Sequence, residues 1–213
     1  MFDNDNRHYR CLSDYGLVLV LTLLGITLSL VASATEDSTS AIEDSEKMKQ
    51  ESMDAFKQFS NMSDKQKNST MQYMSDTDKS MIMMGASQIN NEVNETIQAM
   101  VPPNTDMSSV YELRSGNFTN AGNISKVSGI SRILSVNDIE FLRFEDFNIT
   151  NGPELHVYFT NNGDLADSKD LGILKGNIGS QNYFLGEIAD QYDTVVIASK
   201  PFKIIYAKAM LQS

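Results

Sequence analysis

His156 is the one histidine in the second half of the chain, and its imidazole can ligate a metal or move a proton. A metal ion such as zinc needs two or three further ligands, for which Asp146 and Glu154 are the candidates. His156 lies in the run Leu155–Phe159, where apolar and polar residues alternate as in a half-buried strand. The alternative is therefore an exposed strand histidine without a ligand.

Methionines are concentrated in one segment, and their thioether sulfurs are soft ligands that can hold Cu(I). Nine of the twelve lie between residues 42 and 100, namely Met48, Met53, Met62, Met71, Met74, Met81, Met83, Met84 and Met100. Met81, Met83 and Met84 are the candidate ligands. Methionine also fills gaps in helix packing or forms a surface for a helical partner. We predict no cofactor, with copper or another redox metal as the alternative.

A glycine-rich run, Lys175-Gly176-Asn177-Ile178-Gly179, can present backbone N–H groups to an anion. The spacing of a phosphate-binding P-loop is absent. The binding candidates around this run and the upstream Asn-Gly-Pro are Asp146, Asn151, His156, Lys175, Asn177, Gln181, Tyr183 and Ser199. The alternative is a tight turn fixed for packing, in which Gln181 and Asn182 bond to the backbone.

No nucleophile has a complete set of catalytic partners. Ser125, Ser128 and Ser199 would have to share His156, so a serine hydrolase is not expected. The net charge of −11 repels nucleic-acid phosphate and excludes DNA or RNA as a partner. Cys11 is the only cysteine, so no disulfide can form within the chain.

Residues 16–34 carry no charge over nineteen positions. As a helix they would span roughly 28 Å, about one bilayer core. Arg7 and Arg10 precede the run, which predicts a cytoplasmic N-terminus with the rest of the chain outside. Ala32-Ser33-Ala34 also fits a signal-peptide cleavage site. Residues 1–34 are thus a signal anchor or a cleaved signal peptide, and the remainder is membrane-tethered or secreted.

Residues 35–107 are predicted to form an acidic stalk followed by a methionine-rich helical segment. Residues 35–45 are rich in Ser, Thr and acids, as in a flexible stalk. Helices are expected at about 42–60, 64–74 and 77–99. Ser63 and Ser75 each precede a residue three positions on, Gln66 and Asp78, that can complete a capping box. Pro102-Pro103 ends the last helix.

In residues 108–213 the pattern changes to short strands separated by turns. The expected strands are Ser128–Val136, Ile139–Phe144, Leu155–Phe159, Tyr183–Ile188, Thr194–Ser199 and Phe202–Leu211. Asn137-Asp138 is a hairpin turn between the first two. Strands of this length and spacing predict a mainly β fold, an antiparallel β-sandwich domain.

Three runs resemble the DM-thirteen domain family, often labelled an electron-transfer domain. They are NGPELHVYFT at 151–160, LGILKGNIGSQNYFL at 171–185 and TVVIASKPFKIIYAKAML at 194–211. The resemblance covers about residues 112–212 and includes Gly116-Asn117-Phe118, Ser128-Gly129 and Asp146-Phe147. It implies an extracytoplasmic β-sandwich.

The resemblance also implies a redox role that depends on a cysteine in the penultimate strand. Ser199 stands at that position, Ala198 at the neighbouring tryptophan, and Ser125 at a frequent histidine. A serine hydroxyl neither cycles electrons nor binds soft metals well. If Ser199 and His156 approach each other beside Asp146, a polar site survives. If Ser199 is buried in the core, the site is lost.

We therefore expect a non-enzymatic surface module that binds a cell-envelope component or a surface protein. The alternative is a redox accessory that holds a metal or cofactor. Six N-x-[ST] sequons fit a surface glycoprotein, at Asn61, Asn68, Asn94, Asn117, Asn123 and Asn148.

Overall fold

The computed structural model describes residues 41–107 and 110–213. The predicted signal or anchor segment, residues 16–34, lies outside these ranges. Within them, no helix has the length and apolar character needed to cross a bilayer. Residues 49–213 form one compact unit.

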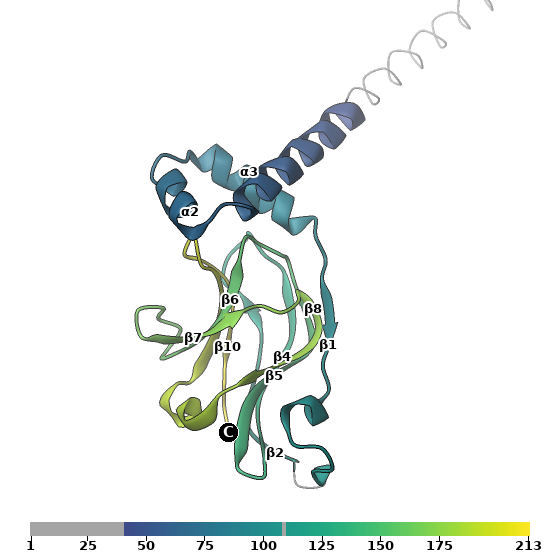
Figure 1. Cartoon of the computed structure of the whole chain (residues 1–213), viewed down its shortest axis with the longest axis vertical. Coiled ribbons are helices and arrows are strands. Elements are labelled where there is room, and N and C mark those ends of the chain that lie inside the picture. Colours follow the sequence, from purple (N-terminus) through teal and green to yellow (C-terminus); the bar gives the residue numbers. More distant parts are fainter. Residues whose placement is uncertain (1–40, 108–109) are drawn as a thin grey trace, which may run out of the picture. The chain divides into compact units, whose positions relative to one another are not determined.

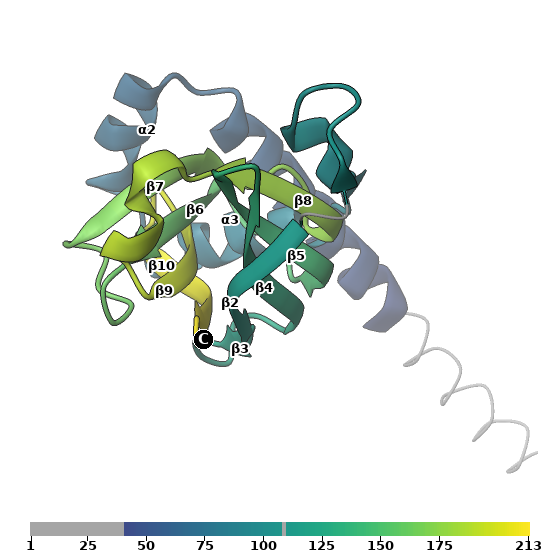
Figure 2. The ribbon, with the colours of Figure 1, turned by 90° about the horizontal axis from the view of Figure 1, so that it is seen from below.

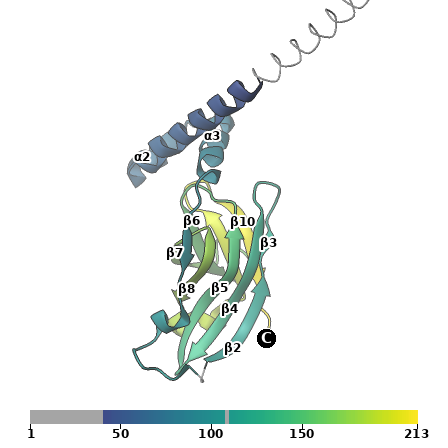
Figure 3. The same ribbon diagram turned by 90° about the vertical axis from the view of Figure 1, so that its right-hand side faces the viewer.

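Three helices begin the described chain. A helix covers residues 41–60, followed by α2 (Asp64–Met71) and α3 (Asp76–Ser87). The two capping boxes are confirmed, with Ser63 bonded to Gln66 and Ser75 to Asp78. The stalk prediction is wrong for residues 41–45, which are helical. Figures 1 and 3 show α2 and α3 at one end of the strands.

The predicted helix 77–99 is wrong over its second half. α3 ends at Ser87, and the chain then forms β1 (Glu92–Asn94) and the 3-10 helix η1 (Ile97–Met100). β1 pairs in parallel with β8 (Ile178–Phe184). Pairing with a distant strand has overridden the local helical preference. The predicted domain boundary at residue 108 therefore falls inside the β region.

The remaining strands complete two five-stranded sheets. They are β2 (Val110–Asn117), β3 (Thr119–Asn120), β4 (Val127–Val136), β5 (Ile139–Ile149), β6 (Leu155–Thr160), β7 (Ser168–Ile173), β9 (Thr194–Ser199) and β10 (Ile204–Met210). Sheet A has the order β1-β8-β5-β4-β2, and sheet B has the order β3-β10-β9-β6-β7. Apart from β1 with β8, every paired strand is antiparallel. The mainly β prediction is confirmed.

Both sheets contribute to one apolar core. Leu142 and Phe144 of sheet A are fully buried in the same cluster as Val157 and Ile197 of sheet B. Figure 2 shows the strands of both sheets around this interior. The opposite face of sheet A is not uniformly polar, because Leu134, Val136 and Phe141 form a second buried cluster there with Val101. In sheet B, β9 is buried along its whole length and β6 is buried except at Tyr158.

Several predicted strands are confirmed and one is misplaced. The hairpin turn is present, with both Asn137 and Asp138 at positive φ. The predicted strand Tyr183–Ile188 is wrong, because β8 ends at Phe184 and the 3-10 helix η3 (Gly186–Gln191) follows. β2 and β7 were not expected, because their polar residues hide the strand pattern.

A ladder of ion pairs crosses the face of sheet A that points away from the core. Arg132 bonds to Glu112 on one side, and its Nε lies 2.8 Å from Glu145 Oε2 on the other. Glu145 Oε1 accepts from Arg143 Nε at 2.7 Å. Partial burial raises the pKa of Glu145, but the hydrogen bonds from the two arginines outweigh this effect and lower it overall.

These ion pairs make the free energy of unfolding depend on pH. A carboxyl whose pKa is lowered by folding stabilises the protein above its unfolded pKa of about 4.3, and this contribution is lost as the pH falls through the folded pKa. We expect the free energy of unfolding, from urea denaturation, to fall below about pH 5. Glu145→Gln removes part of that dependence.

Glu140→Gln is the control for this prediction, because Glu140 lies on the same strand and forms no ion pair within the described ranges. It should keep the wild-type pH profile. A wild-type profile in Glu145→Gln would contradict the prediction.

Candidate functional site

The glycine-rich run before β8 is closed by a buried glutamine. Gln181 Oε1 accepts hydrogen bonds from the backbone N–H groups of Lys175 and Gly176, at 3.1 and 3.2 Å. Its Nε2 donates to Gly176 O at 2.8 Å, and the Tyr183 hydroxyl donates to Oε1 at 2.7 Å. Burial raises the pKa of Tyr183. The N–H groups expected to meet an anion are thus occupied within the chain.

Two asparagines hold the segment that follows α3. Asn177 Oδ1 accepts from the N–H of Asn91 at 2.6 Å, and its Nδ2 donates to Asn90 Oδ1 at 3.2 Å. Asn151, from the Asn-Gly-Pro turn, donates to Ile89 O at 3.1 Å. Asn151 of the Asn-Gly-Pro turn and Asn177 of the glycine-rich run therefore bind the same upstream residues, 89–91.

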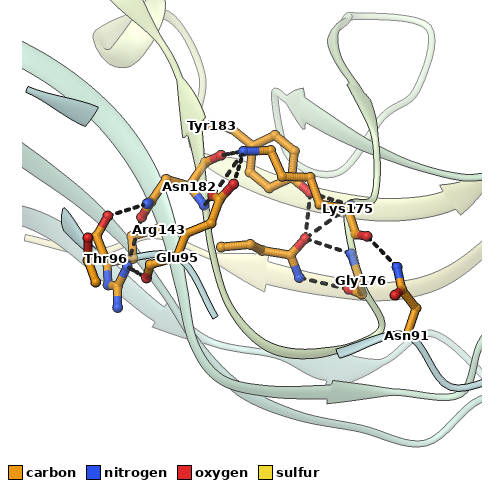
Figure 4. Close-up of polar contacts among 9 residues, drawn as sticks. Asn91, Glu95, Thr96, Arg143, Lys175, Gly176, Asn182 and Tyr183 are labelled. Carbon is orange, nitrogen blue, oxygen red and sulfur yellow. Dashed lines mark hydrogen bonds and ion pairs between the residues drawn. The ribbon is translucent and has the colours of Figure 1, made fainter. Parts of the chain in front are cut away.

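Charged groups continue this attachment along β1, as Figure 4 shows. Lys175 Nζ lies 2.8 and 2.9 Å from the two carboxylate oxygens of Glu95. Glu95 Oε2 also accepts from the N–H of Asn182 at 2.8 Å. Arg143 donates to Glu95 O and to Asn182 Oδ1, at 3.0 and 2.8 Å. The predicted binding residue Lys175 is engaged in an intramolecular ion pair.

The glycines of this run leave room for β1. A Cβ on Gly179 would lie 2.2 Å from Val93 O, and one on Gly176 would lie 2.7 Å from Asn91 O. Gly179 also has a φ of +103°, which L side chains rarely adopt. These contacts and hydrogen bonds support the alternative of a turn fixed for packing.

The hypothesised cluster of Ser199, His156 and Asp146 does not form. Ser199 is fully buried, and its hydroxyl donates to Pro153 O at 2.7 Å. Its cross-strand partner is Leu155, so it faces away from His156. Asp146 lies in an irregular part of β5, in the other sheet. We expected a polar site only if these three residues came together, so that site is absent.

His156 is buried and paired instead of exposed. Its Nδ1 lies 2.9 and 3.0 Å from the two oxygens of Asp170, and Lys200 Nζ lies 3.5 Å from Asp170 Oδ2. The Tyr158 ring stacks with its centroid 6.1 Å from that of His156. Asp170 was missed because β7 was not expected. The pairing of β6 with β7 places Asp170 opposite Tyr158, from where its carboxylate reaches His156.

The described residues contain no group of three or more His, Cys, Asp or Glu side chains arranged to hold a metal. The structure does not bring the three candidate methionines of α3 together either. Met81 lines a groove between the helices, whereas Met84 is exposed and Met83 is half-buried. All six sequon asparagines are exposed, and their glycosylation stays a prediction.

A second groove, here called the lysine groove, lies between α2 and the turn from β9 to β10. It has a volume of about 430 Å³ and carries Lys67, Lys200 and Lys203 together with Asp64 and Glu154. Lys67 Nζ lies 2.6 Å from Glu154 Oε2.

Two aromatic rings pack beside the lysine groove without lining it. Phe59 packs on Phe202 with the ring centroids 5.3 Å apart. Lys67 Nζ lies 5.7 Å from the centroid of the Phe59 ring. The ring contact fixes the helix of residues 41–60 against the β9–β10 turn, and Lys67 links α2 to the same ring.

No family model, curated protein or solved structure matches this chain. The resemblance to the DM-thirteen family therefore rests on the residues quoted above.

The role of Gly179 can be measured by substitution. Gly179→Ala introduces both positive-φ strain and a collision with Val93 O. The control is Gly172→Ala, because Gly172 has a φ of +107° and no atom within 4 Å of the added Cβ. We expect Gly172→Ala to lose roughly 1–3 kcal/mol from backbone strain alone. Gly179→Ala should lose clearly more in urea denaturation, and equal losses would show that β1 does not require this glycine.

The burial of position 199 predicts an inert thiol. In a Cys11→Ser background, the cysteine introduced by Ser199→Cys should react with a disulfide reagent only after denaturation, because burial keeps a thiol protonated and inaccessible. Ser128→Cys, at an exposed position, should react at once. Fast reaction of Ser199→Cys in the native protein would contradict the geometry.

Proposed function

We propose that this chain is a DM-thirteen-like module whose two sheets form a β-sandwich outside the cell. Residues 1–34 would tether it to the membrane or be cleaved on secretion. Its function is binding rather than catalysis, and its partner is an anionic component of the cell envelope. The lysine groove is the proposed contact surface.

The observation that carries this proposal is the gathering of lysines in an otherwise acidic chain. The chain has a net charge of −11, yet Lys67, Lys200 and Lys203 line one groove. The side chain of Lys200 is 52% exposed, and Lys203 is also exposed. Within the described ranges no hydrogen bond or ion pair involves the ammonium group of Lys203. Two exposed ammonium groups can therefore reach the carboxylates of a polymer.

Two of the acids in this region, Glu154 and Asp170, are held by intramolecular contacts, which favours an anionic ligand, whereas Asp64 is an exposed acid that also lines the groove. Glu154 accepts from Lys67, and Asp170 contacts both His156 and Lys200. The acidic surface elsewhere repels an anion, so electrostatic attraction is concentrated at the groove. Exposed charges are screened by salt, so binding should weaken as ionic strength rises.

The engagement of the motif residues supports the same proposal. Asn151, Asn177 and Gln181 use their polar groups within the chain, so they are not offered to a ligand. The redox alternative finds no support at position 199, where a buried serine bonds to a carbonyl oxygen.

Isothermal titration of the full chain with a carboxylated oligosaccharide, such as tetragalacturonate, tests the proposal. We expect measurable binding at low salt. The double variant Lys200→Gln/Lys203→Gln should weaken it roughly fivefold to thirtyfold, since an exposed ion pair contributes up to about 1 kcal/mol.

The control variant also removes two positive charges, but from positions outside the lysine groove. Lys126→Gln/Lys169→Gln removes two exposed lysines outside the groove. Affinity reduced equally in both double variants would show that only net charge matters. No binding of the wild-type chain at low salt would refute an anionic saccharide as the ligand.

A further inference from the structure

Three methionines line one groove between the helices. Met62, Met74 and Met81 are each half-buried, and the groove has a volume of about 330 Å³. Phe59 and Ile82, which also line it, are buried in the packing of the helices. The apolar packing of this region is thus made by other side chains, while these three methionines remain partly open to solvent.

Two of these methionines lie immediately before the N-caps of α2 and α3. Met62 directly precedes the N-cap Ser63 of α2, and Met74 directly precedes the N-cap Ser75 of α3. A side chain at this position usually packs on the fourth residue of its own helix as a hydrophobic staple. Here the fourth residues are Lys67 and Lys79, so no apolar partner is present.

Met81 comes from α3 itself, so the three methionines come from three separate segments. One of them is already oriented, because the Thr70 hydroxyl donates to Met62 Sδ at 3.8 Å. Asp78 also lines the groove, where it caps the helix through Ser75. Its carboxylate supplies a negative charge beside three neutral thioethers.

We propose that Met62, Met74 and Met81 form a binding site for Cu(I). A soft monovalent cation prefers thioether sulfur, while Zn²⁺ and Mg²⁺ prefer nitrogen and oxygen ligands. Asp78 balances the charge of the ion. The ligand set differs from Met81, Met83 and Met84, since only Met81 of that trio lines the groove. The proposal concerns binding and is independent of the lysine groove.

Methionine methyl NMR on the full chain tests this site, with Ag(I) as a redox-inert probe for Cu(I). A Cys11→Ser background removes the only thiol. The chain has twelve methionines, so twelve methyl signals are expected. One equivalent of Ag(I) should shift three of them, and these should be the signals lost in Met62→Leu, Met74→Leu and Met81→Leu.

Affinity measurements give a second readout. Each of these leucine variants should weaken Ag(I) binding by roughly 10-fold to 100-fold, the range found when even a supporting residue of a metal site is lost. Leucine keeps the apolar volume, so folding is retained and is checked by circular dichroism. Met83→Leu and Met84→Leu are the matched controls on α3 and should bind as the wild type does.

Three outcomes would overturn the proposal. They are no methyl shift at one equivalent, shifts of other methionines, and unchanged affinity in all three variants. Each would leave the methionines as packing residues of the helices.

Discussion

The hydrogen bonds between residues 89–96 and the turn before β8 are the constraint on which the rest of the structure depends. Asn177 and Gln181 are buried amides, and each is bonded to backbone groups. A buried polar group left without a partner costs about 1–3 kcal/mol, so the turn and β1 stabilise each other. The same segment leads directly out of α3, and this connection sets where the helices attach to the sheets.

These hydrogen bonds distinguish the residues that hold the fold together from the residues that a partner can reach. Residues of the glycine-rich run hold β1 against β8, as Asn177 and Gly179 show. The groups still available to a partner belong to the helices and to the β9–β10 turn. The lysine groove is lined by residues of α2, and the groove that holds Met62, Met74 and Met81 is lined by residues at the starts of α2 and α3, where capping boxes fix short turns.

Patterns that are local in sequence were predictable. The capping boxes at Ser63 and Ser75 and the Asn137-Asp138 turn need only neighbouring residues, and the existence of β6 as a strand needs only its own residues. The half-burial expected for β6 is wrong, because five of its six residues are buried. The partnership of His156 with Asp170 needs the register of β6 on β7, which no single strand encodes. β1 was not predicted, because the sequence pattern of residues 88–99 suits a helix. Only its pairing with β8 makes this segment a strand. The loss of the cluster at Ser199 likewise required knowing which face of β9 it occupies.

Amide hydrogen exchange on the intact chain tests the central claim most directly. The N–H groups of Asn91 and Glu95 bond to Asn177 Oδ1 and Ser180 O. If β1 is part of the sheet, they should exchange with the same opening free energy as amides in the middle of β8. Exchange at the rate of an exposed loop, while β8 stays protected, would show that residues 89–96 are a linker and would contradict the account.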